Sequence, residues 1–182
     1  GWFTMPGFEL PHISGMDVVG TIVEVGSEVS SVRLGERVIV DPSLTNVPEN
    51  SKLSGRGDLY GELGVIGANV DGGYAELCLV PDTHVYPIPD ELSWHQAATF
   101  PTAWMTAHHA LFDVAQLKEG EVVMIHAAGS GVSMAGIQLA KNAGATVLAT
   151  AGSEGKCEKA LQLGAVFTCV NRNTDVAQWA KE

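Results

Sequence analysis

A segment of small residues near the middle of the chain has the composition of a phosphate-binding turn. It covers residues 127–132, after the apolar run Val122–His126 and before a stretch with helical periodicity. Small residues let a backbone approach a pyrophosphate closely, and the free N–H groups and positive dipole end of a following helix attract that anion. Glycine-rich turns also occur where a strand and a helix only pack closely. The prediction of a phosphate-binding turn therefore depends on the strand and the helix that flank it. The candidate cofactor-binding residues of this turn are Ala128, Gly129, Ser130, Gly131 and Val132.

The residues after the next predicted strand bear on which dinucleotide such a turn would hold. NAD sites usually place Asp or Glu at the end of this strand to bind the ribose 2′-hydroxyl. Here Thr150 is followed by Ala-Gly-Ser-Glu-Gly-Lys, so no carboxylate stands at that position. Ser153 can donate to a 2′-phosphate and Lys156 can neutralise it, although Glu154 would repel it if its side chain turned inward. NADP(H) is therefore expected in preference to NAD(H), with the alternative that Ser153 only caps a helix.

Helical and strand patterns alternate in the second half of the chain, as such a turn requires. Alternation of this kind predicts a parallel sheet with crossover helices. The predicted helices are Trp94–Phe112, Val132–Asn142, Lys156–Leu163 and Asp175–Glu182, and the predicted strands are Val122–His126, Thr146–Thr150 and Val166–Val170. Residues 93–182 are expected to form the first half of a Rossmann nucleotide-binding domain.

The first half of the chain has a different pattern. Short Val and Ile runs, such as those within residues 18–26 and 37–42, are separated by Gly, Pro and Asp. This punctuation predicts short antiparallel strands. Residues 1–92 are therefore expected to form a mainly-β domain, which makes the fold class α/β in two parts.

Composition and charge narrow the class of protein. The 182 residues include 10 Lys and Arg against 21 Asp and Glu, for a net charge of −11, so nucleic acid is not an expected partner. No apolar stretch reaches the roughly 18 residues of a membrane span, and the first residues lack the pattern of a signal peptide. A soluble, cytoplasmic protein with no membrane partner is expected. The three cysteines show no C-x-x-C spacing, which predicts neither a disulfide framework nor a metal site.

Further motifs follow one another along the chain. They are residues 11–20, Val25–Ser27 with Gly35–Val38, Asp71–Glu76 and Pro101–His108, ahead of the small-residue turn. In this order they resemble the medium-chain dehydrogenase/reductase family, the earlier ones its GroES-like domain and the later ones its nucleotide-binding domain. The resemblance implies a substrate domain joined to a cofactor domain. It also implies a piece lacking both ends of the family's fold, with a homodimer possible in the full-length form.

The departures from the family's pattern concern zinc. Met16 stands where zinc alcohol dehydrogenases of this family have a histidine ligand, and Ala98 stands where they have a cysteine. A catalytic zinc site needs three Cys, His or carboxylate ligands. The four cysteines of the family's structural zinc lobe are replaced by Asn46, Glu49, Lys52 and Tyr60. No metal site is therefore expected.

What remains resembles the family's quinone reductase and enoyl reductase branch. The resemblance implies hydride transfer between NADPH and a small-molecule carbonyl, quinone or enone, without a metal. It implies that Thr102 contacts the nicotinamide, with a helix-terminal role as the alternative. Asp17 is either a polar group facing the substrate or a residue left from a metal's surroundings. These two are the candidate catalytic residues, and no proton donor is identified.

Two other functions stay open at this point. One is a catalytically idle fragment that binds a dinucleotide or a protein partner. The other is a zinc-dependent alcohol dehydrogenase whose ligands lie elsewhere in the sequence. Turnover of NADPH distinguishes the first from an active reductase, and the metal content distinguishes the second.

Overall fold

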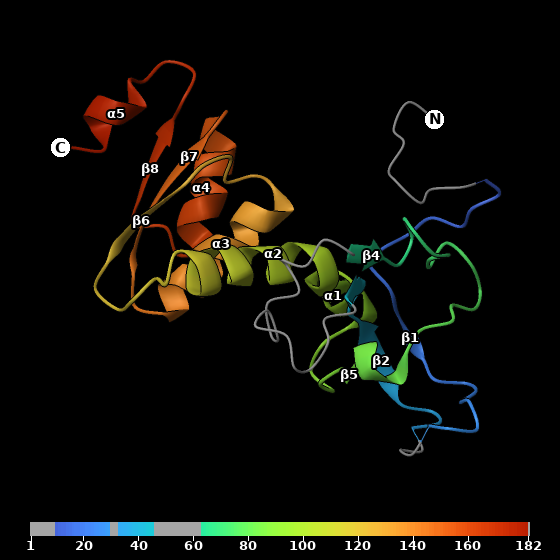
Figure 1. Ribbon diagram of the computed structural model, residues 1–182. Helices are drawn as coiled ribbons and strands as arrows, with labels where there is room; N and C mark the ends of the chain where they lie inside the picture. Colours follow the sequence, from blue (N-terminus) through green and yellow to red (C-terminus); the bar gives the residue numbers. More distant parts are fainter. Residues whose placement is uncertain (1–9, 30–32, 46–62, 182) are drawn as a thin grey trace. The chain divides into compact units, whose positions relative to one another are not determined.

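The computed structural model describes residues 10–29, 33–45 and 63–181 (Figure 1). Its contacts divide the chain into two compact units, residues 1–102 and 103–182. The sequence predicts a domain boundary at residue 92, where the pattern changes from strands to helices. The division in the structure comes later, after Thr102. The short helix α1 (Trp94–Ala97) belongs to the first unit. It is tied there because the Arg37 guanidinium lies 4.4 Å from the centre of the Trp94 ring and donates to the Leu92 carbonyl.

The first unit is built from short antiparallel strands, as the sequence predicts. One sheet has the order β1-β2-β5, and β3 pairs with β4 in a second. The strands are β1 (Val19–Thr21), β2 (Arg37–Val40), β3 (Ser43–Thr45), β4 (Leu63–Val65) and β5 (Val85–Pro87). Every second residue of β2 is buried, as expected for a strand with one face on a core. That core consists of Val38, Val40, Ile66 and Val85.

Two loops of the first unit are fixed against each other by their backbones. The N–H of Gly72 donates to the Ile13 carbonyl at 2.7 Å, and the N–H of Gly73 donates to the Gly15 carbonyl at 2.9 Å. A Cβ added to Gly72 would collide with the Gly15 carbonyl oxygen. Glycine is therefore required here because two backbones approach closely.

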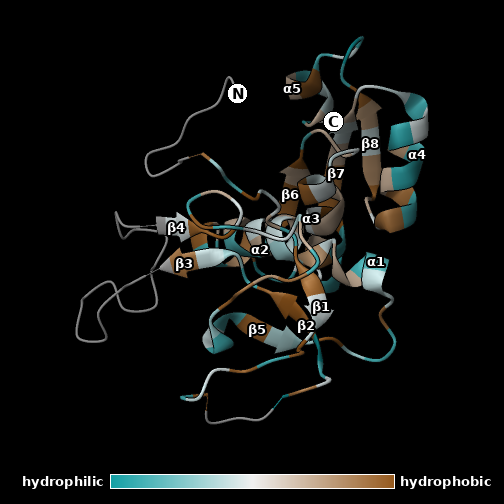
Figure 2. Ribbon diagram, turned by 90° about the vertical axis from the view of Figure 1, so that its right-hand side faces the viewer, coloured by the Kyte–Doolittle hydropathy of each residue, from teal (hydrophilic) through white to brown (hydrophobic). Residues whose placement is uncertain are grey.

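The second unit contains a three-stranded parallel sheet of order β6-β7-β8. The strands are β6 (Val122–Ile125), β7 (Thr146–Ala151) and β8 (Phe167–Val170), and the helices are α3 (Gly131–Asn142), α4 (Glu154–Leu163) and α5 (Val176–Trp179). Apolar residues dominate the strands, while α4 alternates hydrophilic and hydrophobic segments (Figure 2). Ile137, Val147, Ala149 and Ala160 are fully buried between the sheet and α3 and α4. This confirms the predicted βαβαβ unit.

The helix predicted for Trp94–Phe112 is wrong as a single α-helix. The structure has α1, a π-helical turn at Phe100–Trp104, helix α2 (Met105–His108) and a second π-helical turn at His109–Val114. Pro101 has no N–H to donate, so a regular α-helical ladder cannot pass through it. In the second π-helical turn the N–H of Ala115 donates to the Ala110 carbonyl, five residues back.

Candidate functional site

The turn between β6 and α3 is held to the end of the neighbouring strand. The N–H of Ala128 donates to the Thr150 carbonyl on β7 at 2.9 Å, and the Ala128 side chain is buried. Ala127 has a positive φ of 53°, a conformation that residues other than glycine seldom adopt. Such a conformation persists where the surrounding contacts enforce it.

Ser130 caps the helix that follows. Its hydroxyl accepts from the Ser133 N–H at 3.2 Å and donates to the Ser133 hydroxyl at 2.8 Å. Gly131 and Val132 form the first positions of α3, where N–H groups have no acceptor within the helix. The arrangement leaves these N–H groups and the positive end of a 12-residue helix available to an anion.

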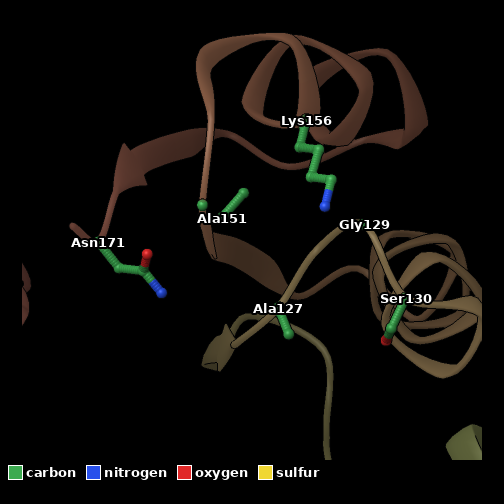
Figure 3. A pocket seen from close by; sticks show the side chains of 7 residues that line it. Ala127, Gly129, Ser130, Ala151, Lys156 and Asn171 are labelled. Atoms are coloured by element: carbon green, nitrogen blue, oxygen red, sulfur yellow. The ribbon is translucent and has the colours of Figure 1, made fainter.

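A cavity of about 290 Å³ opens beside this turn (Figure 3). Its walls come from the turn, the end of β7, the first residues of α4 and the residue after β8. They are Ala127, Gly129, Ser130, Ala151, Gly152, Lys156 and Asn171. Ligands of open α/β sheets bind at this carboxyl edge of the strands. Among the residues that the structure describes, no Asp or Glu lines the cavity.

Lys156 lies directly across Gly129. A Cβ added to Gly129 would be 2.8 Å from Cδ of Lys156, so the lysine stem covers the glycine. Figure 3 shows Lys156 reaching from α4 toward Gly129, beside the cavity. The turn and the cation predicted from the sequence therefore lie at one site.

One predicted residue lies outside the cavity lining, and two residues that were not predicted lie at or near it. Ser153 occupies the N-cap position of α4, yet its side chain makes no capping hydrogen bond and does not line the cavity. Asn171 lines the cavity, and Nε of Arg172 is 3.8 Å from where a Cβ on Gly152 would be. Both follow β8, whose carboxyl end lies at the same edge of the sheet as that of β7. Asn171 and Arg172 could have been predicted from the sequence by their position directly after the third predicted strand.

The two catalytic candidates are neighbours in the first unit. The N–H of Thr102 donates to Oδ1 of Asp17 at 2.9 Å, which binds one carboxylate oxygen to the backbone. In the part of the chain that the structure describes, the buried Thr102 hydroxyl has no hydrogen-bond partner. Asp17 thus has a structural role, and Thr102 keeps an unused hydroxyl.

The donors near the family's zinc positions do not fit a zinc ion. Met16 offers a thioether, Ala98 offers no donor, and an Asp17 oxygen already accepts from Thr102. Within residues 10–29, 33–45 and 63–181, no three His, Cys, Asp or Glu side chains come together in a way that could hold a metal. The positions of the structural lobe, Asn46, Glu49, Lys52 and Tyr60, lie outside the described residues.

Two of the three thiols, those of Cys78 and Cys169, are unsuited to nucleophilic chemistry. Cys78, Cys157 and Cys169 are free. Burial raises the pKa of Cys169, with a smaller contribution from Cys157, and burial followed by the charge of Asp71 raises the pKa of Cys78. A raised pKa leaves a thiol protonated and weakly nucleophilic at neutral pH.

None of the helices in the described ranges has the length and hydrophobicity needed to span a bilayer.

Two family models match the chain. The model described as alcohol dehydrogenase GroES-like domain matches residues 1–90, and the model described as zinc-binding dehydrogenase matches residues 131–182. The first match covers the strand-rich part of the chain, and the second begins at the first residue of α3.

Relatives and solved structures agree with these matches. The quinone oxidoreductase of Mus musculus is 36% identical over 156 residues, which are 86% of this chain and 39% of the relative. The alcohol dehydrogenase of Geobacillus stearothermophilus is 39% identical over 176 residues, which are 96% of this chain and 51% of the relative. The crystal structure of an NAD-dependent alcohol dehydrogenase superposes with a TM-score of 0.84 at 36% identity, over 91% of this chain and 48% of that one. The chain spans about half the length, or less, of these proteins.

Proposed function

Because the chain belongs to the medium-chain dehydrogenase/reductase superfamily, we propose that it transfers hydride between NADPH and a carbonyl, quinone or enone substrate without zinc. The superfamily consists of dehydrogenases that bind nicotinamide dinucleotides. The choice of NADPH and the absence of a metal are the proposed steps beyond family membership. A homodimer of the full-length protein belongs to the same proposal.

The observation that carries the proposal is the charge pattern of the cavity in the second unit. Lys156 lines it, Arg172 lies beside its Gly152 wall, and none of its described lining residues is a carboxylate. A ribose 2′-hydroxyl is usually held by a carboxylate, whereas a 2′-phosphate needs cations and hydrogen-bond donors. This pattern favours the phosphorylated cofactor.

Different groups of the chain would hold different parts of NADPH. The N–H groups of Gly131 and Val132, at the positive end of the α3 dipole, would bind the pyrophosphate. Lys156 would act on the 2′-phosphate as a point charge, and Arg172 would add a planar set of donors. Ser153 remains a proposed donor to the same phosphate, because its hydroxyl is not used in capping.

Thr102 is the residue that we propose to contact the nicotinamide. When bound, the reduced cofactor supplies the hydride that an electron-poor carbon of the substrate accepts. The unpaired Thr102 hydroxyl can donate to the carboxamide of the nicotinamide, which would remove the cost of about 1–3 kcal/mol of leaving a buried hydroxyl without a partner. Asp17 holds the Thr102 backbone in place for this contact.

Donor chemistry in the same unit supports the proposed absence of zinc. Met16 and Ala98 cannot replace the histidine and cysteine ligands of the zinc enzymes. A reductase of this kind instead relies on orienting the two reactants and on hydrogen bonds to the oxygen that becomes negative.

Parallel fluorescence titrations with NADPH and NADH test the cofactor assignment. We expect saturable binding, with NADPH at least about tenfold tighter than NADH, because only NADPH carries the phosphate that Lys156 and Arg172 can neutralise. Equal affinity, or a preference for NADH, would contradict the assignment.

Turnover and metal content then decide among functions. Oxidation of NADPH by quinones or enones in a zinc-free sample supports the proposal. Binding without turnover of any quinone, enone or simple carbonyl would point to an idle binding module. Stoichiometric zinc with alcohol-dependent reduction of NAD+ would point to a zinc alcohol dehydrogenase.

A further inference from the structure

We propose that His126 is a positioning residue for the dinucleotide turn, acting through its hydrogen bond to Thr150. The inference rests on the proposed function, because it assumes that the turn between β6 and α3 holds the pyrophosphate of a dinucleotide. It concerns how the turn is kept in a binding conformation.

Thr150 holds the turn at two points. Its hydroxyl is 3.0 Å from Nδ1 of His126, and its carbonyl accepts from the Ala128 N–H at 2.9 Å. Thr150 is fully buried within the sheet, so it is a fixed reference for both contacts. The residue between these two attachment points is Ala127, whose φ is positive. The two hydrogen bonds therefore enclose the residue with the least favourable backbone conformation in the turn.

His126 is attached to the helix as well as to the sheet. Its carbonyl accepts from the Ser133 hydroxyl at 2.7 Å, and that hydroxyl also accepts from the capping residue Ser130. A rotation of the His126 backbone would consequently move the first turn of α3. The N–H groups of Gly131 and Val132 lie in that turn and are the groups proposed to face the pyrophosphate.

The side chain of His126 is exposed, which makes the proposal testable by substitution. Replacing an exposed ring leaves no cavity in the core, so His126→Ala is expected to fold. His126→Asn is the conservative variant, because its amide carries a polar atom at the same number of bonds from the backbone as Nδ1. Thr150→Val removes the partner hydroxyl while keeping the shape of the side chain.

The test compares ligands with and without a pyrophosphate. NADPH needs the turn, whereas 2′-AMP carries the 2′-phosphate alone and needs only the cations around Lys156. We expect His126→Ala to weaken NADPH about tenfold and to leave 2′-AMP within about twofold, with His126→Asn close to wild type. Thr150→Val should weaken NADPH similarly, and adding it to His126→Ala should weaken NADPH little further.

If His126 only stabilised the fold, its substitution would change the two affinities in a different way. Equal loss for NADPH and 2′-AMP, or unchanged NADPH affinity in a folded His126→Ala protein, would overturn the inference. Thermal unfolding of each variant shows whether a loss of NADPH binding is caused by unfolding. If His126→Ala does not fold, His126→Asn decides: retained NADPH affinity supports the inference, and lost affinity in a folded protein overturns it.

The outcome is separable from that of the proposed function. If the wild type prefers NADH, the NADPH assignment fails, and the same comparison with NADH and adenosine, which carries no phosphate, still tests His126. If the wild type binds neither dinucleotide, both the proposed function and the role of His126 are overturned.

Discussion

Lys156 lines the cavity, and Arg172 lies beside its Gly152 wall. Lys156 belongs to α4, and Arg172 follows β8. A lysine contributes a compact charge, and an arginine contributes a planar fork of donors that suits phosphate oxygens. Removing one of the two cations should therefore weaken, without abolishing, recognition of a 2′-phosphate.

Reversing the charge of Lys156 gives a direct measure of this recognition. We expect Lys156→Glu to weaken NADPH by about tenfold to a hundredfold, because a charge-assisted hydrogen bond is lost and repulsion replaces it. NADH, which lacks the phosphate, should change much less. The two dissociation constants are measured by fluorescence titration.

Lys159 provides the matched control for this substitution. It is exposed on the same helix and does not line the cavity. Lys159→Glu changes the net charge of the protein equally and should affect both dinucleotides alike. If Lys156→Glu resembled Lys159→Glu, Lys156 would have no part in binding the phosphate.

At the scale of single residues, the turn and Lys156 were predicted from the sequence, whereas Asn171 and Arg172 were not. The first two follow from local patterns, a small-residue turn and a missing carboxylate. The other two come near Gly152 only because β7 and β8 pair in a parallel register, with Ala151 opposite Val170. Such a register joins residues about twenty positions apart and depends on tertiary packing.

The elements of the second unit pack around small and apolar side chains, among them two thiols. Cys157 on α4 and Cys169 on β8 are both buried. Burial raises the pKa of Cys169, so the folded state favours its protonated form. The stability that comes from this neutral thiol is complete below the ordinary cysteine pKa of 9.0 and is lost as the pH rises above it.

The free energy of unfolding should therefore fall as the pH rises above 9.0. Cys169→Ala should lower stability by about 1 kcal/mol at neutral pH, because a buried atom is removed, and should show a shallower alkaline fall. Urea unfolding at several pH values measures both effects.

Val170→Ala is a suitable comparison, since Val170 is the next residue of β8, is partly buried against the core of the second unit and cannot ionise. It should lose stability at all pH values and keep the alkaline slope of the wild type. An unchanged slope in Cys169→Ala would show that other groups cause the fall.

The elements themselves were predicted well where a repeating pattern is regular. Helices α3 and α4 and the three parallel strands lie within a few residues of their predicted bounds. The segment 94–114 was predicted less well, because apolar spacing in an α-helix and in π-helical turns is similar over a short stretch. Pro101 was the local sign that an α-helix could not continue there.

At the scale of the whole molecule, charge limits where an anionic cofactor can bind. The chain carries a net charge of −11, which repels a dinucleotide phosphate in general. Binding must then depend on local groups such as Lys156 and the N-terminal N–H groups of α3. Because the groups that attract the phosphates all lie in the second unit and are few, we expect single substitutions among them to change the dinucleotide affinity strongly.

The proposed absence of zinc makes a second prediction at this scale, which concerns how the substrate is polarised. A protein that uses zinc to polarise its substrate loses activity when a chelator removes the ion. With Met16 and Ala98 at the former ligand positions, we expect 1,10-phenanthroline to leave NADPH oxidation unchanged, and elemental analysis to find less than about 0.1 zinc per chain. Loss of activity on chelation, followed by recovery with added zinc, would contradict this expectation and require ligands outside the described residues. Unchanged activity would leave orientation and hydrogen bonding, with Thr102 as the first group to test, as the means by which the protein promotes hydride transfer.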